Sequence, residues 1–374
     1  MIPCELMLQI LDYDYILPPE LIAKEPAMPR DHSRLFIYDT QKDNIIFDYF
    51  YNLAKHLPQN SYLVLNETKV LPSRIVLTKQ SSGKVSTFFL VNEQMDDSDT
   101  MRVMVDRKVK IGDRLFFNKE DSVEVIAQDK HLFTVNIPFG KIRLFKLLEE
   151  KGTMPIPLYI KNSPLKEKEL REKYQTIFAR APGDARLCGS VAAPTASLHF
   201  TEDVFRSFKK KNIEQLFITL HVGLGTFAPV SEKSISEKKL HEEWYEVPKK
   251  IESKKIVAVG TTVVRTLESM SLSLRTPLSG VKQSKKEIAS SSGSSETPRN
   301  DIVDKTDLFI YPPFQFKMVD HLITNFHLPG SSLMMLVEAF LQHKGARRSL
   351  VELYQVAIKE KFRFYSFGDA MLIL

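Results

Sequence analysis

The chain has 374 residues, of which 43% are hydrophobic and 26% are charged, and this apolar fraction excludes a mainly disordered protein. Lysine and arginine number 52 against 46 aspartate and glutamate residues, which gives a formal net charge of +6. A positive balance suits a polyanionic partner such as nucleic acid, but it is also ordinary for a soluble enzyme of this length.

Cysteine content and hydropathy exclude two further classes. The two cysteines, Cys4 and Cys188, cannot form a disulfide framework or a four-cysteine zinc site. The longest apolar runs, such as Leu333–Val337, are far shorter than the ~20 residues that span a bilayer. Met1–Pro19 carries acidic side chains and no basic region, unlike a signal peptide. We therefore expect a cytoplasmic protein without a membrane segment.

The region before residue 73 alternates extended and turn patterns. Strands are predicted at Arg34–Asp39, Ile45–Phe50 and Tyr62–Asn66, with a short helix at Tyr51–Leu57. From Arg74 to Pro138, short apolar segments alternate with turn clusters at intervals of about ten residues, as in a small β-barrel. These segments are 75–78, 85–91, 101–105, 114–117, 123–126 and 132–137.

The second half of the chain alternates helical and extended patterns, which predicts an open α/β sheet. Helices are expected at 141–151, 202–211 with Thr201 as N-cap, 261–270, 331–343 and 349–359, and strands at 216–222, 256–259 and the C-terminus.

These patterns predict an α/β main domain with an open sheet, residues 1–72 and 139–374. An inserted small antiparallel β-barrel domain is expected at 73–138. The segment 271–305 is rich in Ser and Lys and has few large apolar residues, so we expect a mobile surface loop there.

Two segments rich in small residues allow a ligand to approach the backbone. Gly189–Phe200 offers Thr195, Ser197 and His199 as hydrogen-bonding side chains, or it is simply a tightly packed turn. Thr219–Phe227 ends a predicted strand and exposes backbone N–H groups that suit a nucleotide. Its candidate ligand-binding residues are Gly223, Gly225 and Thr226.

The Gly-x-Gly pattern lacks both a third glycine and a P-loop lysine, so it is a weak fingerprint. His221 in the same segment is either a functional imidazole or a satisfied core histidine.

A predicted strand runs directly into a helix at Thr261 and Thr262. The free N–H groups of such a helix start suit a carboxylate or phosphate. Arg265 and Glu268 follow three residues apart and form either part of that site or a surface ion pair.

Three further loops carry candidate side chains. Asn325 and His327 precede a Pro-Gly turn and a Ser-capped helix start. Arg363 and Asp369 lie among aromatic residues that could stack on bases or belong to a docked C-terminal strand. Lys69 and Arg74 lie in a polar loop at the start of the predicted barrel. Neither a metal-ligand cluster nor a serine-hydrolase elbow is recognisable in the sequence.

Together these segments closely resemble the S-adenosylmethionine:tRNA ribosyltransferase-isomerase family of queuosine biosynthesis. The barrel region matches the family only in pattern. The matching blocks are Asp12–Ala23, Arg30–Leu35, Asn66–Arg74, Tyr174–Ala179, Gly189–Thr201, Thr219–Phe227, Val259–Ser269, Leu322–Pro329 and Phe364–Ile373.

The chain departs from the family pattern in four places. Gly183–Cys188 is an insertion, Ser197 replaces a usual glycine, and Gly330 stands where many relatives have a basic residue. Lys238 replaces the first histidine of a His-x-Met-His-x-Glu motif, of which His241 and Glu243 carry over. The insertion could alter a loop over the active site.

The resemblance implies that S-adenosylmethionine is consumed as a ribosyl donor, with no metal. The acceptor would be 7-aminomethyl-7-deazaguanine at the wobble position of a tRNA with a GUN-type anticodon. Epoxyqueuosine, adenine and methionine would result, and neither a membrane nor an obligatory protein partner is expected.

This chemistry suggests roles for the candidate residues. His221 or His327 could act as a base, and Asp369 or Glu268 could accept the N–H groups of the deazaguanine. The methionine carboxylate fits the helix start at Thr261 and Thr262 near Arg265. Further contacts to S-adenosylmethionine are expected from Thr195, His199, Gly223, Gly225, Thr226 and Asn325, and contacts to RNA from Lys69, Arg74 and Arg363.

Two alternatives remain open. The Gly-x-Gly strand end is compatible with an S-adenosylmethionine-dependent RNA methyltransferase, which would release S-adenosylhomocysteine instead of adenine. Net charge and aromatic content are also compatible with a tRNA-binding protein without catalytic activity.

Overall fold

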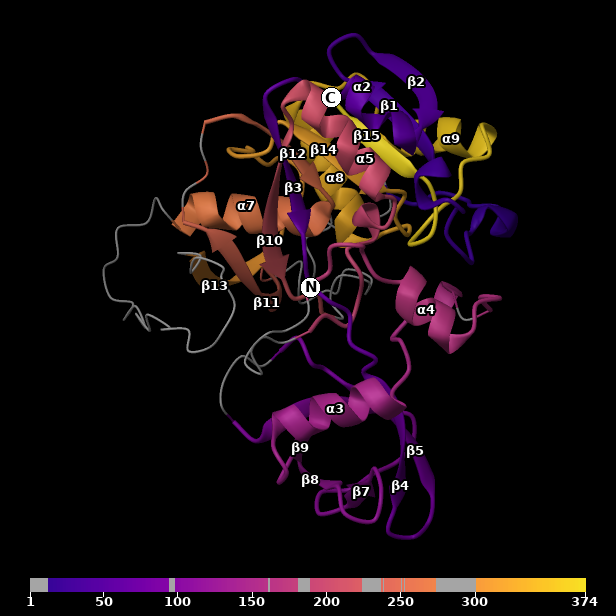
Figure 1. Ribbon diagram of the computed structural model, residues 1–374, viewed down its shortest axis with the longest axis vertical. Helices are drawn as coiled ribbons and strands as arrows, with labels where there is room; N and C mark the ends of the chain where they lie inside the picture. The colour runs from indigo at the N-terminus through magenta and orange to yellow at the C-terminus, as the bar shows by residue number, and fades with distance from the viewer. Residues whose placement is uncertain are drawn as a thin grey trace.

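The computed structural model describes residues 13–93, 98–160, 162–180, 189–223, 237, 239–249, 251, 253–273 and 301–374. Within these residues the chain forms a nine-stranded mixed sheet and a separate closed barrel of six strands. In Figure 1 the sheet and its helices occupy the upper part of the molecule and the barrel the lower part. This confirms the predicted fold class, an open α/β sheet combined with a small antiparallel barrel.

The strands of the sheet follow the order β13-β11-β10-β3-β12-β14-β15-β1-β2. The central strands β10, β3, β12 and β14 are mutually parallel, β15 runs antiparallel to β14, and β1 is parallel to β15. The bounds are β1 (Arg34–Asp39), β2 (Asn44–Tyr49), β3 (Ser61–Asn66), β10 (Glu214–Leu220), β11 (Lys239–Pro248), β12 (Lys255–Val259), β13 (Asp301–Leu308), β14 (His321–Asn325) and β15 (Ala370–Ile373).

Helices cover both faces of the sheet because alternate residues of each buried strand point to opposite sides. In β3, Leu63 and Leu65 pack with α2 (Leu53–His56) and α5 (Glu202–Phe208). Tyr62 and Val64 belong to the opposite core, which includes α7 (Thr261–Ser273), α8 (Ser332–His343) and α9 (Leu350–Lys359).

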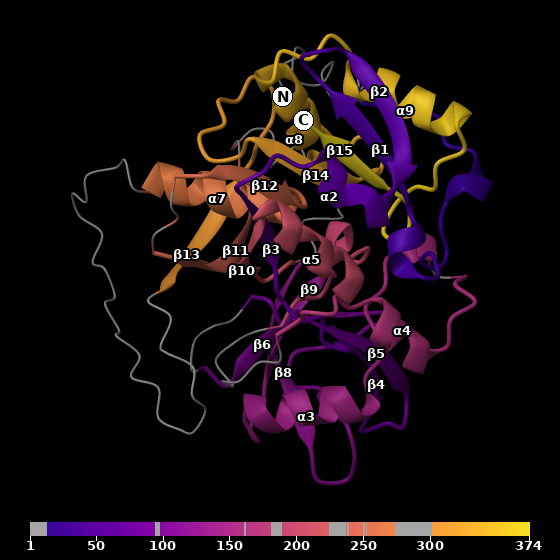
Figure 2. The same cartoon turned by 45° about the horizontal axis from the view of Figure 1, so that its top comes forward.

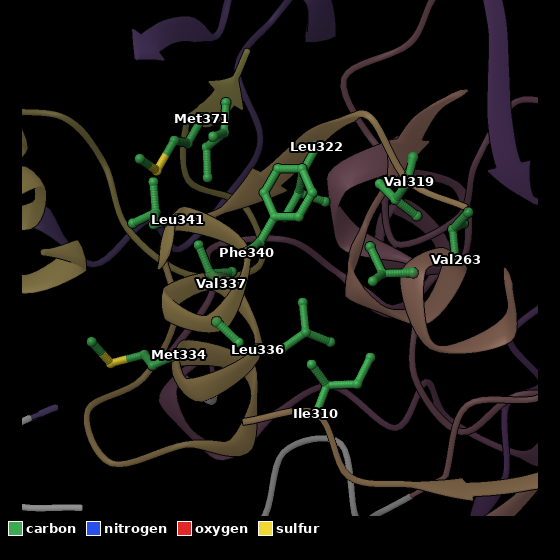
Figure 3. Packing of buried hydrophobic residues seen from close by; sticks show 14 of the residues in the cluster. Val263, Ile310, Val319, Leu322, Met334, Leu336, Val337, Phe340, Leu341 and Met371 are labelled. Atoms are coloured by element: carbon green, nitrogen blue, oxygen red, sulfur yellow. The ribbon is translucent and has the colours of Figure 1, made fainter. Parts of the chain in front are cut away.

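Figure 3 shows part of this second core. The ring of Phe340 from α8 lies beside Leu322, and Val263 projects from α7. The predicted N-caps are present, since the side chains of Thr201, Ser331 and Ser349 accept backbone N–H groups of α5, α8 and α9.

The barrel encloses a core of its own, which α3 (Lys141–Lys151) covers. In Figure 2 the barrel and α3 lie at the bottom of the molecule, and α8 and α9 lie at the top. Arg74 and Thr153 exchange both backbone hydrogen bonds, so the chain enters and leaves this region side by side. Its strands are β4 (Arg74–Lys79), β5 (Lys84–Phe89), β6 (Thr100–Val105), β7 (Arg114–Phe116), β8 (Ser122–Asp129) and β9 (Leu132–Asn136). The domain bounds 1–72, 73–138 and 139–374 stay a prediction.

The predicted loop 271–305 is wrong at both ends. Helix α7 continues to Ser273, and β13 begins at Asp301, where it pairs with β11. Sequence reasoning missed both strands because their polar, half-exposed residues are stabilised by pairing with each other, which a single sequence does not reveal. Residues 274–300 lie outside the described residues. None of the described helices has the length and apolar character needed to cross a membrane.

Candidate active site

One edge of the sheet collects the segments that the sequence singled out. The carboxyl ends of β10, β3, β12 and β14 lie at the same edge because these strands are parallel, and β15 begins beside the end of β14. Ligands of open α/β sheets bind outside this edge. Residues at these ends are His221 after β10, Thr261 after β12, Asn325 and His327 at the end of β14, and Asp369 before β15.

The segment 189–199 crosses this edge. Ser190 N–H donates to the carbonyl of Lys69 at 2.8 Å, and Val191 N–H donates to that of Val222 at 3.0 Å. Eight residues after Val191, the ring of His199 lies 3.3 Å from Asn325 Nδ2. The half-buried Thr195 lies in the short 3-10 helix η5 (Thr195–Ser197) between these two contacts.

The end of β3 and β10 forms what we call the His221 corner, made by Asn66, Thr68, Ser190, His221, Glu243 and Arg265. Asn66 bonds both the N–H and the carbonyl of Leu220 and also the N–H of Thr68. Thr68 Oγ1 lies 2.7 Å from Ser190 Oγ and 3.2 Å from His221 Nδ1. Burial lowers the pKa of His221 to about 4, so the imidazole is neutral at pH 7.

A buried ion pair completes the His221 corner. Arg265 Nη1 pairs with Glu243 Oε2, and both side chains are almost fully buried. Glu243 Oε1 accepts the N–H of Gly223 at 2.7 Å. Arg265 Nε donates to the carbonyl of Leu308, while its buried Nη2 has no hydrogen-bond partner in the described part of the chain. The surface Arg265–Glu268 pair considered above is therefore absent, because each side chain is buried with other partners.

Asn92 of the barrel region also reaches the His221 corner. A Cβ added to Gly223 would lie 2.5 Å from Asn92 Nδ2 and 3.4 Å from Glu243 Oε1, so a side chain at this position would collide with Asn92. A larger side chain at position 223 would therefore require the buried side chain of Asn92 to move.

Helix α7 begins at the same edge, directly after Gly260, whose φ of +93° favours glycine. Thr261 and Thr262 are 5% and 6% exposed, and Thr262 Oγ1 has no hydrogen-bond partner among the described residues. A helix start with an unpartnered hydroxyl is compatible with the predicted carboxylate site.

Glu268 lies about 10 Å along α7 from Thr261, at ~1.5 Å per residue. Its carboxylate accepts the backbone N–H groups of Lys317, Met318 and Val319. Burial raises the pKa of this carboxyl, while the three N–H groups lower it. These contacts favour a role in holding the 317–319 segment.

The opposite end of the edge forms the Asp369 corner, made by Arg34, His199, Asn325, His327, Arg363 and Asp369. The carboxylate of Asp369 accepts the backbone N–H groups of Arg34 and Arg363 at 3.0 and 2.8 Å. It also pairs with the guanidinium of Arg363 at 3.2 Å. Because these donors occupy both carboxylate oxygens, the contacts favour Asp369 as the residue that closes the 363–369 loop.

Two histidines of the Asp369 corner are neutral. His327 Nε2 lies 2.7 Å from Thr324 Oγ1, and burial lowers the pKa of His327 to about 3. The main chain of His327 is held by Tyr354, which accepts its N–H, and by Tyr15, which donates to its carbonyl. Burial, then the charges of Arg363 and Arg30, lower the pKa of His199 to about 3.

The predicted RNA-contacting cations are all partly engaged. Lys69 pairs with Glu149, and Arg363 pairs with Asp369. Arg74 lies over the ring of Phe88 at 4.6 Å, and burial lowers the pKa of its guanidinium. The aromatics near Arg363 do not form a base-stacking surface, because Phe362, Phe364 and Phe367 are buried in the core. The docked C-terminal strand is the correct interpretation of that motif.

Some of the predicted positions cannot be placed. Gly225, Thr226, the insertion Gly183–Cys188 and Lys238 lie outside the described residues. Within the part of the chain that is described, no three His, Cys, Asp or Glu side chains are grouped so that they could hold a metal ion.

Sequence reasoning missed several residues of the His221 corner. Thr68 and Ser190 lie in the blocks that match the family. Nothing in the sequence shows that their hydroxyls contact each other next to His221. Glu243 could be found from the sequence, because it matches the final glutamate of the family's His-x-Met-His-x-Glu motif. Asn92 carried no such signal.

Comparisons with known proteins show similarity along nearly the whole chain. A sequence model of the family described as "queuosine biosynthesis protein" matches residues 10–373. The chain is 39% identical to a protein of Thermotoga maritima and 41% identical to one of Thermosipho melanesiensis, each over 378 residues. Each alignment covers 98% of this chain and 100% of the relative. Both relatives are named S-adenosylmethionine:tRNA ribosyltransferase-isomerase.

A solved structure is also similar. The crystal structure of an S-adenosylmethionine tRNA ribosyltransferase from Thermotoga maritima aligns with a TM-score of 0.48 and 31% sequence identity. The alignment covers 97% of this chain and 100% of that one.

Proposed function

The chain belongs to the family of queuosine biosynthesis proteins, and we propose that it is an S-adenosylmethionine:tRNA ribosyltransferase-isomerase. It transfers and isomerises the ribosyl group of S-adenosylmethionine onto 7-aminomethyl-7-deazaguanine at the wobble position of a GUN-type tRNA. Epoxyqueuosine-tRNA, adenine and methionine are the products. The observation that carries this proposal is similarity to enzymes of that name over 98% of the chain.

The site at the sheet edge supports this chemistry through two neutral histidines. The reaction needs a base for an acidified C5′ proton of S-adenosylmethionine and a hydrogen-bond donor for the departing adenine. His221 and His327 have pKa values lowered by burial to about 4 and about 3, so at pH 7 each has one ring nitrogen to accept and one to donate. We assign these two tasks to the two histidines.

The methionine end of S-adenosylmethionine is assigned to the start of α7. The unpartnered hydroxyl of Thr262 and the N–H groups of the first turn suit its carboxylate. Arg265 lies one turn into the same helix, where its guanidinium pairs with Glu243. The remaining cofactor-binding assignments, Thr195, His199, Gly223 and Asn325, lie along the same edge.

The tRNA is assigned to the side of the edge that the barrel flanks. Lys69 and Arg74 lie where the chain passes from β3 into the barrel, and they contact Glu149 and the ring of Phe88, respectively. Lysine and arginine at such positions can bind phosphates of the RNA backbone.

The test is product analysis with purified protein, S-adenosylmethionine and tRNA that carries the aminomethyl-deazaguanine precursor. Adenine and methionine should appear in equal amounts, together with epoxyqueuosine in the digested tRNA. Release of S-adenosylhomocysteine would instead indicate a methyltransferase. Binding of tRNA without turnover of S-adenosylmethionine would indicate a protein that only binds RNA.

A further inference from the structure

A chain of two buried hydroxyls ends on the ring of His221. Ser190 Oγ accepts the N–H of Val222 at 2.8 Å and lies 2.7 Å from Thr68 Oγ1, which lies 3.2 Å from His221 Nδ1. Ser190, Thr68 and His221 are 0%, 2% and 5% exposed. Bulk water therefore has little access to any of these groups.

The backbone around this chain is held in place from both sides. Asn66 fixes the main chain of Thr68 and Leu220, and His221 N–H donates to the carbonyl of Trp244 at 2.9 Å. Ser190 is bonded through its N–H to Lys69 and through its carbonyl to Leu71. The two hydroxyls cannot easily turn toward other partners.

The direction of the hydrogen bonds follows from counting protons. Each hydroxyl donates one proton. If Thr68 donated to Ser190, the proton of Ser190 would have no acceptor among the described residues, because Ser190 Oγ otherwise contacts only the Val222 N–H. A buried hydroxyl without an acceptor is unfavourable. Every group is satisfied only when Ser190 donates to Thr68 and Thr68 donates to His221 Nδ1.

We propose that Thr68 and Ser190 are positioning residues that hold His221 as the neutral tautomer with its proton on Nε2. The ring then offers the substrate a hydrogen-bond donor and not a base. This assignment rests on the proposed function. In that reaction a ring nitrogen of the departing adenine is a neutral hydrogen-bond acceptor, which matches the Nε2–H donor of His221. Removal of the substrate proton falls to another group, for which His327 is the candidate. Burial of His221, which lowers its pKa to about 4, keeps the ring neutral at pH 7.

The tautomer can be measured without any substrate. Protein labelled with ¹³C and ¹⁵N histidine is studied by NMR at pH 7, and the His221 signals are assigned by their loss in His221→Gln. We expect ring shifts of a neutral imidazole protonated at Nε2. Protonation at Nδ1 in the unaltered protein overturns the proposal, whatever its activity.

Variants test whether the hydroxyl of Thr68 causes this state. Thr68→Val removes the donor, so the Nδ1–H form should become populated and kcat should fall about tenfold, less than the roughly 100-fold or more expected when the proton donor itself is lost. Thr68→Ser keeps the donor and should restore both the His221 spectrum and most of kcat. Unchanged His221 shifts in folded Thr68→Val would refute the role of Thr68.

A matched control is Ser61→Ala at the opposite end of β3. Ser61 is also fully buried and donates to the carbonyl of Pro58. Its loss should change neither the His221 shifts nor kcat. If the unaltered protein releases no adenine, the proposed function fails, whereas the spectrum still decides the tautomer.

Discussion

The two ends of the candidate active-site edge contain similar side chains that make different contacts. The His221 corner and the Asp369 corner each hold a carboxylate–arginine pair and at least one neutral histidine. At the His221 corner the pair is buried on both sides, with 4% and 3% of the side chains exposed. At the Asp369 corner the arginine is 33% exposed and the carboxylate 2%.

The difference lies in what the polar groups hold. Asp369 binds the main chain of Arg34 and Arg363 and so closes a loop. Thr68 and Ser190 instead hold a histidine side chain, and Glu243 holds Gly223 and Arg265. Equal composition therefore does not indicate equal function. We expect substitutions in the first corner to change chemistry as well as stability, and those at Asp369 to change mainly stability.

The largest effect on stability is expected for Glu243→Gln. It leaves Arg265 charged and buried without its partner, which costs about 3–5 kcal/mol in unfolding free energy. Urea denaturation measures this loss. Glu242→Gln is the control, because Glu242 pairs with Lys305 at an exposed position, where ion pairs contribute about 0–1 kcal/mol. Equal losses for the two variants would contradict the buried pair.

His221→Ala should have the largest effect on catalysis, a fall in kcat of about 100-fold, as is typical for loss of a positioned proton-transfer group. The protein should keep its circular dichroism spectrum and melting behaviour. His131→Ala, at an exposed position in the barrel, serves as control and should leave kcat unchanged. Near-normal turnover in His221→Ala would remove the histidine from the reaction.

Asp369→Asn sharpens the comparison between the corners. The amide has one acceptor oxygen in place of two and places N–H groups against the donors of Arg34 and Arg363, so stability should fall by about 2 kcal/mol. At a temperature where the variant is folded, kcat should stay within about threefold of the original value, because the loop position is retained. A tenfold loss of kcat in fully folded protein would make Asp369 part of the chemistry.

A smaller effect is expected from pH. His221, His199 and His327 have pKa values lowered to about 4, 3 and 3 in the folded protein, whereas an unfolded histidine titrates near 6.5. The unfolded state thus binds protons first as the pH falls, so stability is complete above pH 6.5 and decreases below it. Between pH 6.5 and 5 each histidine should remove about 1.5 kcal/mol. His221→Gln should show a shallower decrease in thermal unfolding experiments.

Local patterns made much of this molecule predictable. Thr201, Ser331 and Ser349 begin helices where their side chains can cap them, and the turn-separated apolar segments of the barrel each form a strand. The alternation of strands and helices predicted the open α/β sheet. These features depend on neighbours in the sequence, which a single chain reveals.

The partners of the polar side chains were not predictable in this way. The sequence suggested that Asp369 or Glu268 accepts N–H groups of the substrate base, but backbone N–H groups distant in the chain occupy both carboxylates. Arg265 of α7 pairs with Glu243 of β11. Because β11 was not predicted from the sequence, this ion pair could not be predicted either. Which donor meets which acceptor depends on tertiary packing, and residue type alone does not determine it.

The paired backbones of Arg74 and Thr153 have a consequence for how this protein can vary. The polypeptide between them leaves and returns at this one antiparallel pair. The two Cα atoms of such a pair lie about 5 Å apart. Loops inside the barrel can lengthen, shorten or drift in sequence without changing that spacing. The barrel is nevertheless tied to the sheet by its packing, since Leu71 and Val191 belong to the barrel core and Asn92 lies against Gly223.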